Sequence, residues 1–241
     1  MSAVFILLIA GLAVLSACTS APKLKEVRFS KEEAVPLDAT QWKITYDGDG
    51  KAEFQKSGIF LQPRVPKHDQ DTIAALVVSR FLPRQNDFRL RVRYLVERQL
   101  RRNEGTSESA PRPWEVFWLF WGYREGRSPA LKETNYFILK SNGVELGRAF
   151  EETEQTFLAT ATTPKLALAH SHELVLTRIS NRVSVDVDGI SALEFSNSEW
   201  PQAFYEANGK IGLYVEDAGA VVQGVWISYP EAQFSASHRT P

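Results

Sequence analysis

The segment from Pro113 to Phe150 constrains the fold more than any other part of the chain, because aromatic and aliphatic side chains dominate it. If residues 115–123 form a strand, successive side chains point to opposite faces. Both faces are then apolar, with Phe117, Leu119, Trp121 and Tyr123 on one and Val116, Trp118 and Phe120 on the other. We therefore predict a central strand that is covered on both sides. Residues 136–139 form a second apolar strand, and Asn142-Gly143 predicts a hairpin turn after it.

Residues 88–100 show the clearest alternation in the chain. Phe88, Leu90, Val92, Tyr94 and Val96 fall on one face and three arginines, at positions 89, 91 and 93, on the other. This period predicts a half-buried strand rather than a helix. The arginine row could bind an anionic glycan or a phosphate surface, but a row of this kind more often only keeps a sheet face soluble.

The rest of the chain repeats the strand pattern at intervals of roughly ten residues, with turn signals between the segments. The predicted strands lie at 27–29, 42–46, 52–61, 72–81, 156–160, 172–179, 182–187, 192–195, 209–215 and 220–228. Asp188-Gly189 predicts a hairpin, residues 47–50 a turn between two strands, and residues 216–219 the last hairpin turn. Helical periodicity is not convincing anywhere. We predict an all-β fold, a two-sheet antiparallel jelly-roll sandwich that covers residues 38–229 as one domain.

The net charge of the chain bears on its possible partners. The 241 residues include 28 basic and 29 acidic side chains, for a net charge of -1. This balance gives no reason to expect nucleic acid as a partner, and we expect a monomer.

The N-terminal residues predict where in the cell the protein is located. Residues 1–17 have the apolar core of a signal peptide, and Leu15-Ser16-Ala17-Cys18 resembles the lipobox of bacterial lipoproteins. This resemblance implies cleavage before Cys18 and a lipid on that cysteine; ordinary signal-peptide cleavage is the alternative. Thr19 stands where an inner-membrane lipoprotein would have aspartate, so the resemblance implies the outer membrane, with the protein facing the periplasm or the cell surface. We expect residues 18–37 to be a tether and residues 230–241 a tail.

Several sequence segments, taken together, resemble the concanavalin-A-like lectin/glucanase superfamily. They are Pro113-Trp114-Glu115, NYFILKSNGVELGRAF from Asn135, QTFLAT from Gln155, SVDVDG from Ser184 and GKIGLYVEDA from Gly209. The pattern is most similar to 3-keto-disaccharide hydrolase and laminarinase-like (glycoside hydrolase family 16-like) domains. The resemblance implies two curved sheets, a concave face that receives sugars, and in some members a structural calcium ion.

The carboxylate array of family 16 glycosidases, E-x-D-x-x-E or E-x-D-x-E on one strand, is missing. That array places a nucleophile and an acid about 5 Å apart around one glycosidic bond. We therefore favour carbohydrate binding over retaining hydrolysis. An enzyme of the glycoside or 3-keto-disaccharide hydrolase type, and a structural envelope protein that binds other proteins, remain as alternatives.

The recognised segments also supply candidate site residues. Glu115 and Glu145 are the candidate acid or base residues, although ion pairs with Lys140 or Arg148 would explain them equally well. The candidate sugar-binding residues are Trp118, Trp121, Tyr123, Arg124, Asn135, Tyr136 and Lys140. The two tryptophans fall on opposite faces, so at most one lines a groove, and core packing is the stronger explanation for both.

A calcium site is the one cofactor that the sequence suggests. The turn carboxylates Asp47, Asp49, Glu216 and Asp217 are candidate ligands for Ca²⁺, because first and last strands commonly meet in a jelly roll. The alternative, which we favour, is that they cap turn amides.

Overall fold

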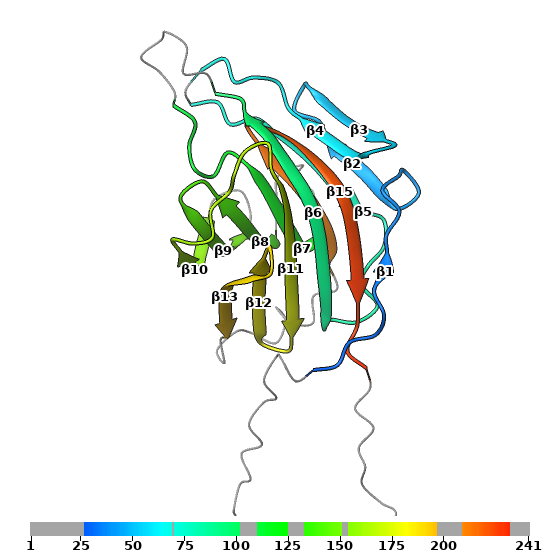
Figure 1. The fold of residues 1–241 in the computed structure, drawn as a ribbon. Helices are drawn as coiled ribbons and strands as arrows, with labels where there is room; N and C mark the ends of the chain where they lie inside the picture. Colours follow the sequence, from blue (N-terminus) through cyan, green and yellow to red (C-terminus); the bar gives the residue numbers. More distant parts are fainter. Residues whose placement is uncertain are drawn as a thin grey trace, which may run out of the picture.

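The computed structural model describes residues 27–68, 70–101, 110–124, 133–150, 154–196 and 209–231, so the predicted signal peptide and Cys18 lie outside the described residues. Within these ranges the chain forms two antiparallel sheets and no helix (Figure 1). None of the described residues belongs to a helix long and apolar enough to cross a bilayer. The predicted all-β, two-sheet sandwich is confirmed.

One sheet has eight strands in the order β13-β12-β11-β6-β15-β4-β3, with β1 paired to β15. Their bounds are β1 Glu33–Ala34, β3 Lys51–Gln55, β4 Gly58–Gln62, β6 Phe88–Gln99, β11 Ser171–Ile179, β12 Arg182–Val187, β13 Ile190–Ser196 and β15 Ala218–Ser228.

The other sheet has seven strands in the order β10-β9-β8-β7-β14-β5-β2. Their bounds are β2 Trp42–Tyr46, β5 Ala74–Ser79, β7 Phe117–Arg124, β8 Glu133–Lys140, β9 Gly143–Phe150, β10 Glu154–Ala161 and β14 Lys210–Glu216. The aromatic strand β7 is the middle one, as predicted, and the Asn142-Gly143 hairpin joins β8 to β9.

The inner faces of the two sheets, which point toward each other, form the core. Tyr94 of β6 packs on Phe117 of β7, with ring centroids 4.3 Å apart. All five apolar side chains of the predicted alternation in β6 are buried, and so are Phe117, Leu119 and Trp121 on the inner face of β7. The period-two pattern in each strand therefore gives the sandwich its single core.

The arginine row of β6 lies on the outer face of the eight-stranded sheet and makes contacts within the chain. Arg91 pairs with Glu32 and with Glu173, and its guanidinium lies 3.9 Å from the centroid of the Trp226 ring. Arg89 lies over the ring of Phe29. These contacts favour the structural explanation of the row over anion binding.

Two predicted hairpins are wrong. Strands β2 and β3, on either side of the turn at residues 47–50, belong to different sheets. Strands β14 and β15 also belong to different sheets, and only Asp217 separates them. In both places the turn carries the chain from one layer to the other, which a strand-turn-strand pattern cannot distinguish from a hairpin. The predicted strand at 52–61 is likewise divided into β3 and β4.

A bulge at Gly122 changes one predicted side-chain direction. The pairing of β7 with β14 shifts by one residue, so that Phe120 opposes Gly212 but Tyr123 opposes Lys210. Gly122 takes a φ of 68°, which favours glycine. Tyr123 therefore lies on the same face as Phe120, not on the face of Trp121 as predicted.

The chain ends of the described domain lie together. The backbone N–H of Ser30 donates to the carbonyl oxygen of Tyr229, and the backbone N–H of Glu231 donates to that of Arg28. These two bonds join the first and last described segments. Strand β15 begins just after the turn at Asp217 and extends over 11 residues, roughly 36 Å, to these chain ends (Figure 1). This turn and the two termini thus lie at opposite ends of the sandwich.

Candidate functional site

The outer face of the seven-stranded sheet, which points away from the core, carries a row of functional side chains. Directly paired residues of neighbouring strands lie on the same face. One such row crosses the whole sheet: Tyr46, Leu76, Tyr214, Trp118, Ile138, Glu145 and Thr160. Residues from all seven strands therefore share one surface although many of them are far apart in the sequence.

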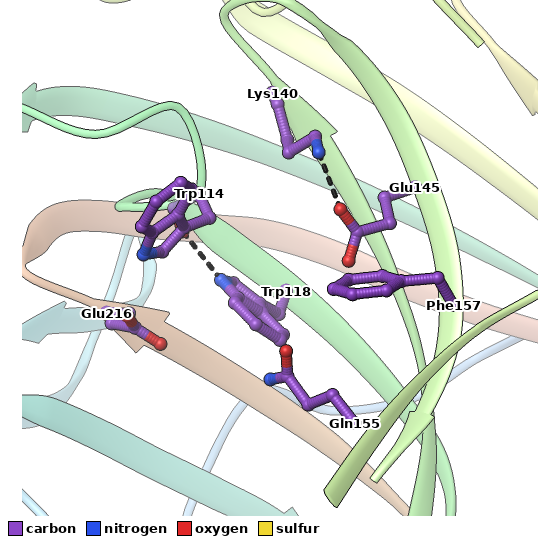
Figure 2. Close-up of a pocket in the computed structure, with 7 residues that line it drawn as sticks. All are labelled: Trp114, Trp118, Lys140, Glu145, Gln155, Phe157 and Glu216. Carbon is purple, nitrogen blue, oxygen red and sulfur yellow. Dashed lines mark hydrogen bonds and ion pairs between the residues drawn. The ribbon is translucent and has the colours of Figure 1, made fainter. Parts of the chain in front are cut away.

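A pocket of about 400 Å³ opens on this face, near the end of the sandwich at which Glu216 lies. Figure 2 shows the aromatic rings in the middle and the charged groups around them. The pocket is lined by Trp114, Trp118, Lys140, Glu145, Gln155, Phe157 and Glu216. Its volume is within the range typical of small-ligand sites.

Aromatic rings form the apolar wall of the pocket. Trp118 is 4% exposed, and its Nε1 donates a hydrogen bond to the backbone oxygen of Trp114 at 2.9 Å. The Trp118 ring also packs on the rings of Tyr136 and Tyr214. By contrast, Trp114 is 39% exposed and Phe157 is 62% exposed. Trp118 is thus held rigidly, while the other two rings offer apolar surface to a ligand.

Glu145 forms one polar wall and is held by two donors. The Tyr136 hydroxyl donates to its Oε1 at 3.0 Å, and Lys140 Nζ lies 2.5 Å from its Oε2. Gly147 makes room for this arrangement, because a Cβ atom there would lie 2.2 Å from Tyr136 Cζ. The carboxylate is therefore both oriented and paired with a cation, as Figure 2 shows for Lys140.

Glu216 forms the other polar wall. Its side chain comes from the end of β14 and the residue is 8% exposed. Its Oε2 accepts a hydrogen bond from the Tyr214 hydroxyl at 3.0 Å. Burial raises the pKa of Glu216 to about 7, and the nearby carboxylates Asp217 and Glu115 act in the same direction. A carboxyl group with such a pKa exchanges its proton near neutral pH.

A buried ionic cluster lies behind Glu216. Arg101 Nε lies 2.5 Å from Glu115 Oε1, and Arg101 Nη2 lies 3.1 Å from Asp217 Oδ2. Asp217 Oδ1 also accepts the backbone N–H of Ile73 at 2.9 Å. Burial raises the pKa of both Glu115 and Asp217, and Arg101 opposes that shift. This cluster joins the segments next to the ends of β5, β6, β7 and β14.

The structure places the predicted site residues in three groups. Trp118, Lys140 and Glu145 line the pocket, and Tyr136 contacts Glu145 from the same face. Trp121 and Asn135 lie opposite each other on the inner face, and Tyr123 is buried beyond the bulge. Arg124 lies at the exposed end of β7.

The second carboxylate of the pocket is not the one expected. Glu115 does not line the pocket, since it is 1% exposed and pairs with Arg101. Glu216, which the sequence suggested only as a calcium ligand, lies in the pocket instead. The sequence analysis also missed Trp114, Gln155 and Phe157. The recognised segments contain all three, and the alternation of Gln155 and Phe157 could have indicated them.

The four predicted calcium ligands do not converge. Asp47 accepts the backbone N–H of Asp49 at 3.1 Å, and Asp49 lies 3.5 Å from Arg64. Asp217 and Glu216 have the separate partners described above. Among the residues that the structure describes, no group of three or more His, Cys, Asp or Glu side chains is arranged to hold a metal ion.

No protein-family model matches the chain, and no curated protein matches it either. Solved structures do. The carbohydrate-binding module CBM66 from Bacillus subtilis is similar with a TM-score of 0.54 and 14% identity, over 77% of this chain and 93% of that one. The exoplasmic/lumenal domain of VIP36 bound to Ca²⁺ and Man3GlcNAc has a TM-score of 0.57 and 12% identity, over 89% and 93%.

A Bacillus subtilis protein of unknown function with a galectin-like fold is similar to the same extent, with a TM-score of 0.57 and 11% identity, over 85% of this chain and 100% of that one. At these identities the likeness concerns the fold. The chain therefore shares the jelly-roll sandwich fold with these three structures.

Proposed function

We propose that the protein binds carbohydrate in the pocket on the outer face of the seven-stranded sheet. The observation that carries this proposal is the composition of the pocket: three aromatic rings, two carboxyl groups, one amide and one ammonium group. The apolar C–H face of a pyranose ring packs on indole and phenyl rings, while its hydroxyls hydrogen-bond to carboxylates and amides at the rim.

The fold supports this function by analogy. The similar structures include a protein named as a carbohydrate-binding module and the exoplasmic/lumenal domain of VIP36 with bound Ca²⁺ and Man3GlcNAc. Fold likeness alone does not define a ligand, so the proposal depends on the pocket residues.

We further propose that a lipid on Cys18 holds the protein at the outer membrane. The pocket residue Glu216 lies at the end of β15 that is distant from the chain termini, roughly 36 Å along that strand. A protein attached through its N-terminus would thereby present the pocket away from the membrane surface.

A thermal-shift screen of the purified protein against a panel of glycans tests binding. A glycan present at about a hundred times its Kd should stabilise the fold by roughly 2.7 kcal/mol. Phe157→Ala should reduce the shift. Ile190→Ala is a matched control, because Phe157 is 62% exposed and Ile190 61%, yet only Phe157 lines the pocket. A panel without any shift would contradict the proposal.

Cleavage of a glycosidic bond is the second candidate function. It is favoured by Glu216, whose pKa of about 7 suits a general acid, and by Glu145 in the same pocket. The strands that carry them, β9 and β14, are three positions apart in the sheet, roughly 14 Å. This is wider than the separation of about 5 Å that retaining glycosidases need, so cleavage ranks below binding. Product analysis on every glycan that binds distinguishes the two functions, and an enzyme should lose turnover in both Glu145→Gln and Glu216→Gln.

A further inference from the structure

Glu216 differs from every other carboxylate around the pocket in having no cationic partner of its own. Within the described residues, its carboxyl group accepts one hydrogen bond, from the Tyr214 hydroxyl to Oε2. Among the described residues no lysine, arginine or histidine side chain lies within ion-pair distance of it. The residue is nevertheless 8% exposed, so water solvates its charge poorly.

The cations around the pocket are engaged elsewhere, and Arg112 lies over the ring of Trp114, 5.7 Å from its centroid. Arg101 pairs with Glu115 and Asp217, so its single charge faces two other carboxylates. Lys140 pairs with Glu145 at 2.5 Å on the opposite polar wall. Burial is the main cause of the raised pKa of Glu216, and the nearby carboxylates Asp217 and Glu115 add to it.

The space in front of Glu216 suits a cation. Trp114, Trp118 and Phe157 line the same pocket, and Figure 2 shows the Trp118 ring between Glu216 and Glu145. The face of an aromatic ring attracts a positive group, most strongly for tryptophan and where water is excluded. A buried carboxylate beside such rings is the combination that recognises ammonium groups.

We infer that the pocket selects sugars that carry a free amino group, with the ammonium placed against Glu216 and the ring on the tryptophans. This inference rests on the proposed carbohydrate binding and adds the class of sugar. A neutral sugar would leave Glu216 without a counter-charge, and a uronic acid would add a further negative charge to the site. The expected order of affinity is therefore amino sugar, then neutral sugar, then uronic acid.

The test compares chemically matched ligands. Oligosaccharides of glucosamine, galactosamine and mannosamine are titrated calorimetrically into the full chain at about pH 7.5. Each is compared with its N-acetylated form, which loses the charge, and with the parent hexose and its uronic acid. For at least one hexose, the amine form should bind about tenfold more tightly than the other forms.

Two variants identify the group responsible. Glu216→Gln keeps the shape of the neutral acid and should reduce the tenfold advantage to about twofold or less, with little change for the parent hexose. Glu53→Gln, an exposed carboxylate on β3 of the other sheet, should retain the full advantage. Thermal unfolding of both variants establishes that the domain remains folded.

The outcomes separate this inference from the proposed function. If a sugar binds equally well as amine, acetamide and parent hexose, the inference is overturned while carbohydrate binding stands. An advantage that persists in Glu216→Gln also overturns it. If no sugar binds in any form, both proposals fail. A preference for the amine that Glu216→Gln removes supports both.

Discussion

Glu216 and Asp217 are adjacent in the chain, but the structure directs them into different environments. Asp217 Oδ2 lies 3.1 Å from Arg101 Nη2 inside the protein, whereas Glu216 lines the pocket. Asp217 takes a φ of 41° at the point where the chain leaves one sheet for the other. One carboxylate thus stabilises the crossover, and its neighbour is available for a ligand.

The free energy of unfolding should decrease as the pH rises from about 4.5 to about 7. The folded pKa of Glu216 is about 7 and its ordinary value is 4.5, so the folded state retains a proton that the unfolded state has already lost. The stability present below pH 4.5 is therefore lost as the pH rises through the folded pKa, by roughly 3 kcal/mol for this group. Burial raises the pKa of Glu115 and Asp217 as well, which adds to the same trend.

Glu216→Gln should flatten this pH profile and stabilise the protein at pH 8 by roughly 1 to 3 kcal/mol, because glutamine replaces an ionised buried group with a neutral one. Urea unfolding at several pH values measures the effect. Glu53→Gln should follow the wild-type profile. An unchanged slope in the Glu216 variant would show that Glu216 is ionised normally in the folded protein.

Arg101→Met should destabilise the fold by roughly 3 to 5 kcal/mol, because it leaves Glu115 and Asp217 buried without a counter-charge. Arg93→Met is the matched control: Arg93 pairs with Glu173 on an exposed sheet face, and its loss should cost about 1 kcal/mol or less. Equal losses in denaturant unfolding of the two variants would refute the role assigned to the buried cluster.

Trp118→Ala should cost roughly 3 to 5 kcal/mol of stability, because the ring is 4% exposed and packs on Tyr136 and Tyr214. Trp114→Ala should cost about 1 kcal/mol or less but weaken glycan binding, since that ring is exposed at the pocket. Thermal unfolding and titration of both variants check the division of roles. Unchanged stability of Trp118→Ala would assign that ring to the ligand alone.

Gly147→Ala should destabilise the protein by roughly 1 to 3 kcal/mol and weaken binding, because its Cβ would displace Tyr136 from Glu145. At Gly219 the nearest atom to an added Cβ is the flexible amide oxygen of Gln62, at 3.3 Å. Gly219→Ala should therefore stay within about 1 kcal/mol of the wild type. Wild-type binding by the Gly147 variant would mean that Tyr136 does not position Glu145.

Cys18→Ser should release the protein from the membrane fraction without changing its thermal unfolding. A lipid chain contributes about 0.8 kcal/mol of membrane affinity per buried methylene. Serine has no thiol and cannot carry the lipid through a thioether linkage. Ser20→Ala should fractionate like the wild type. A Cys18 variant that still sediments with membranes would contradict the lipid anchor.

Much of the fold could be predicted because alternation is a local property of a strand. The faces of β6 follow directly from Phe88 and its alternate neighbours, and Asp188-Gly189, with φ values of 52° and 78°, forms the expected hairpin between β12 and β13. The central position of β7 followed from its two apolar faces.

The candidate site was predictable only in part. Lys140 and Glu145 lie on strands joined by a turn, so their proximity is local, and Trp118 lies on β7, the strand that pairs with β8. Trp121 was assigned correctly to the face opposite Trp118, and that assignment places it in the core rather than the pocket.

Local pattern was thus sufficient for the all-β class, the strand positions and part of one pocket wall, since each depends on residues close together in the chain. The choice of Glu216 over Glu115 as the second pocket carboxylate depended on the tertiary structure. It requires β14 to lie beside β7, the chain to cross between sheets at Asp217, and Arg101 to be buried against Glu115. Arg101 and Asp217 are more than 100 positions apart in the sequence, and no periodicity encodes which carboxylates pair with the buried Arg101.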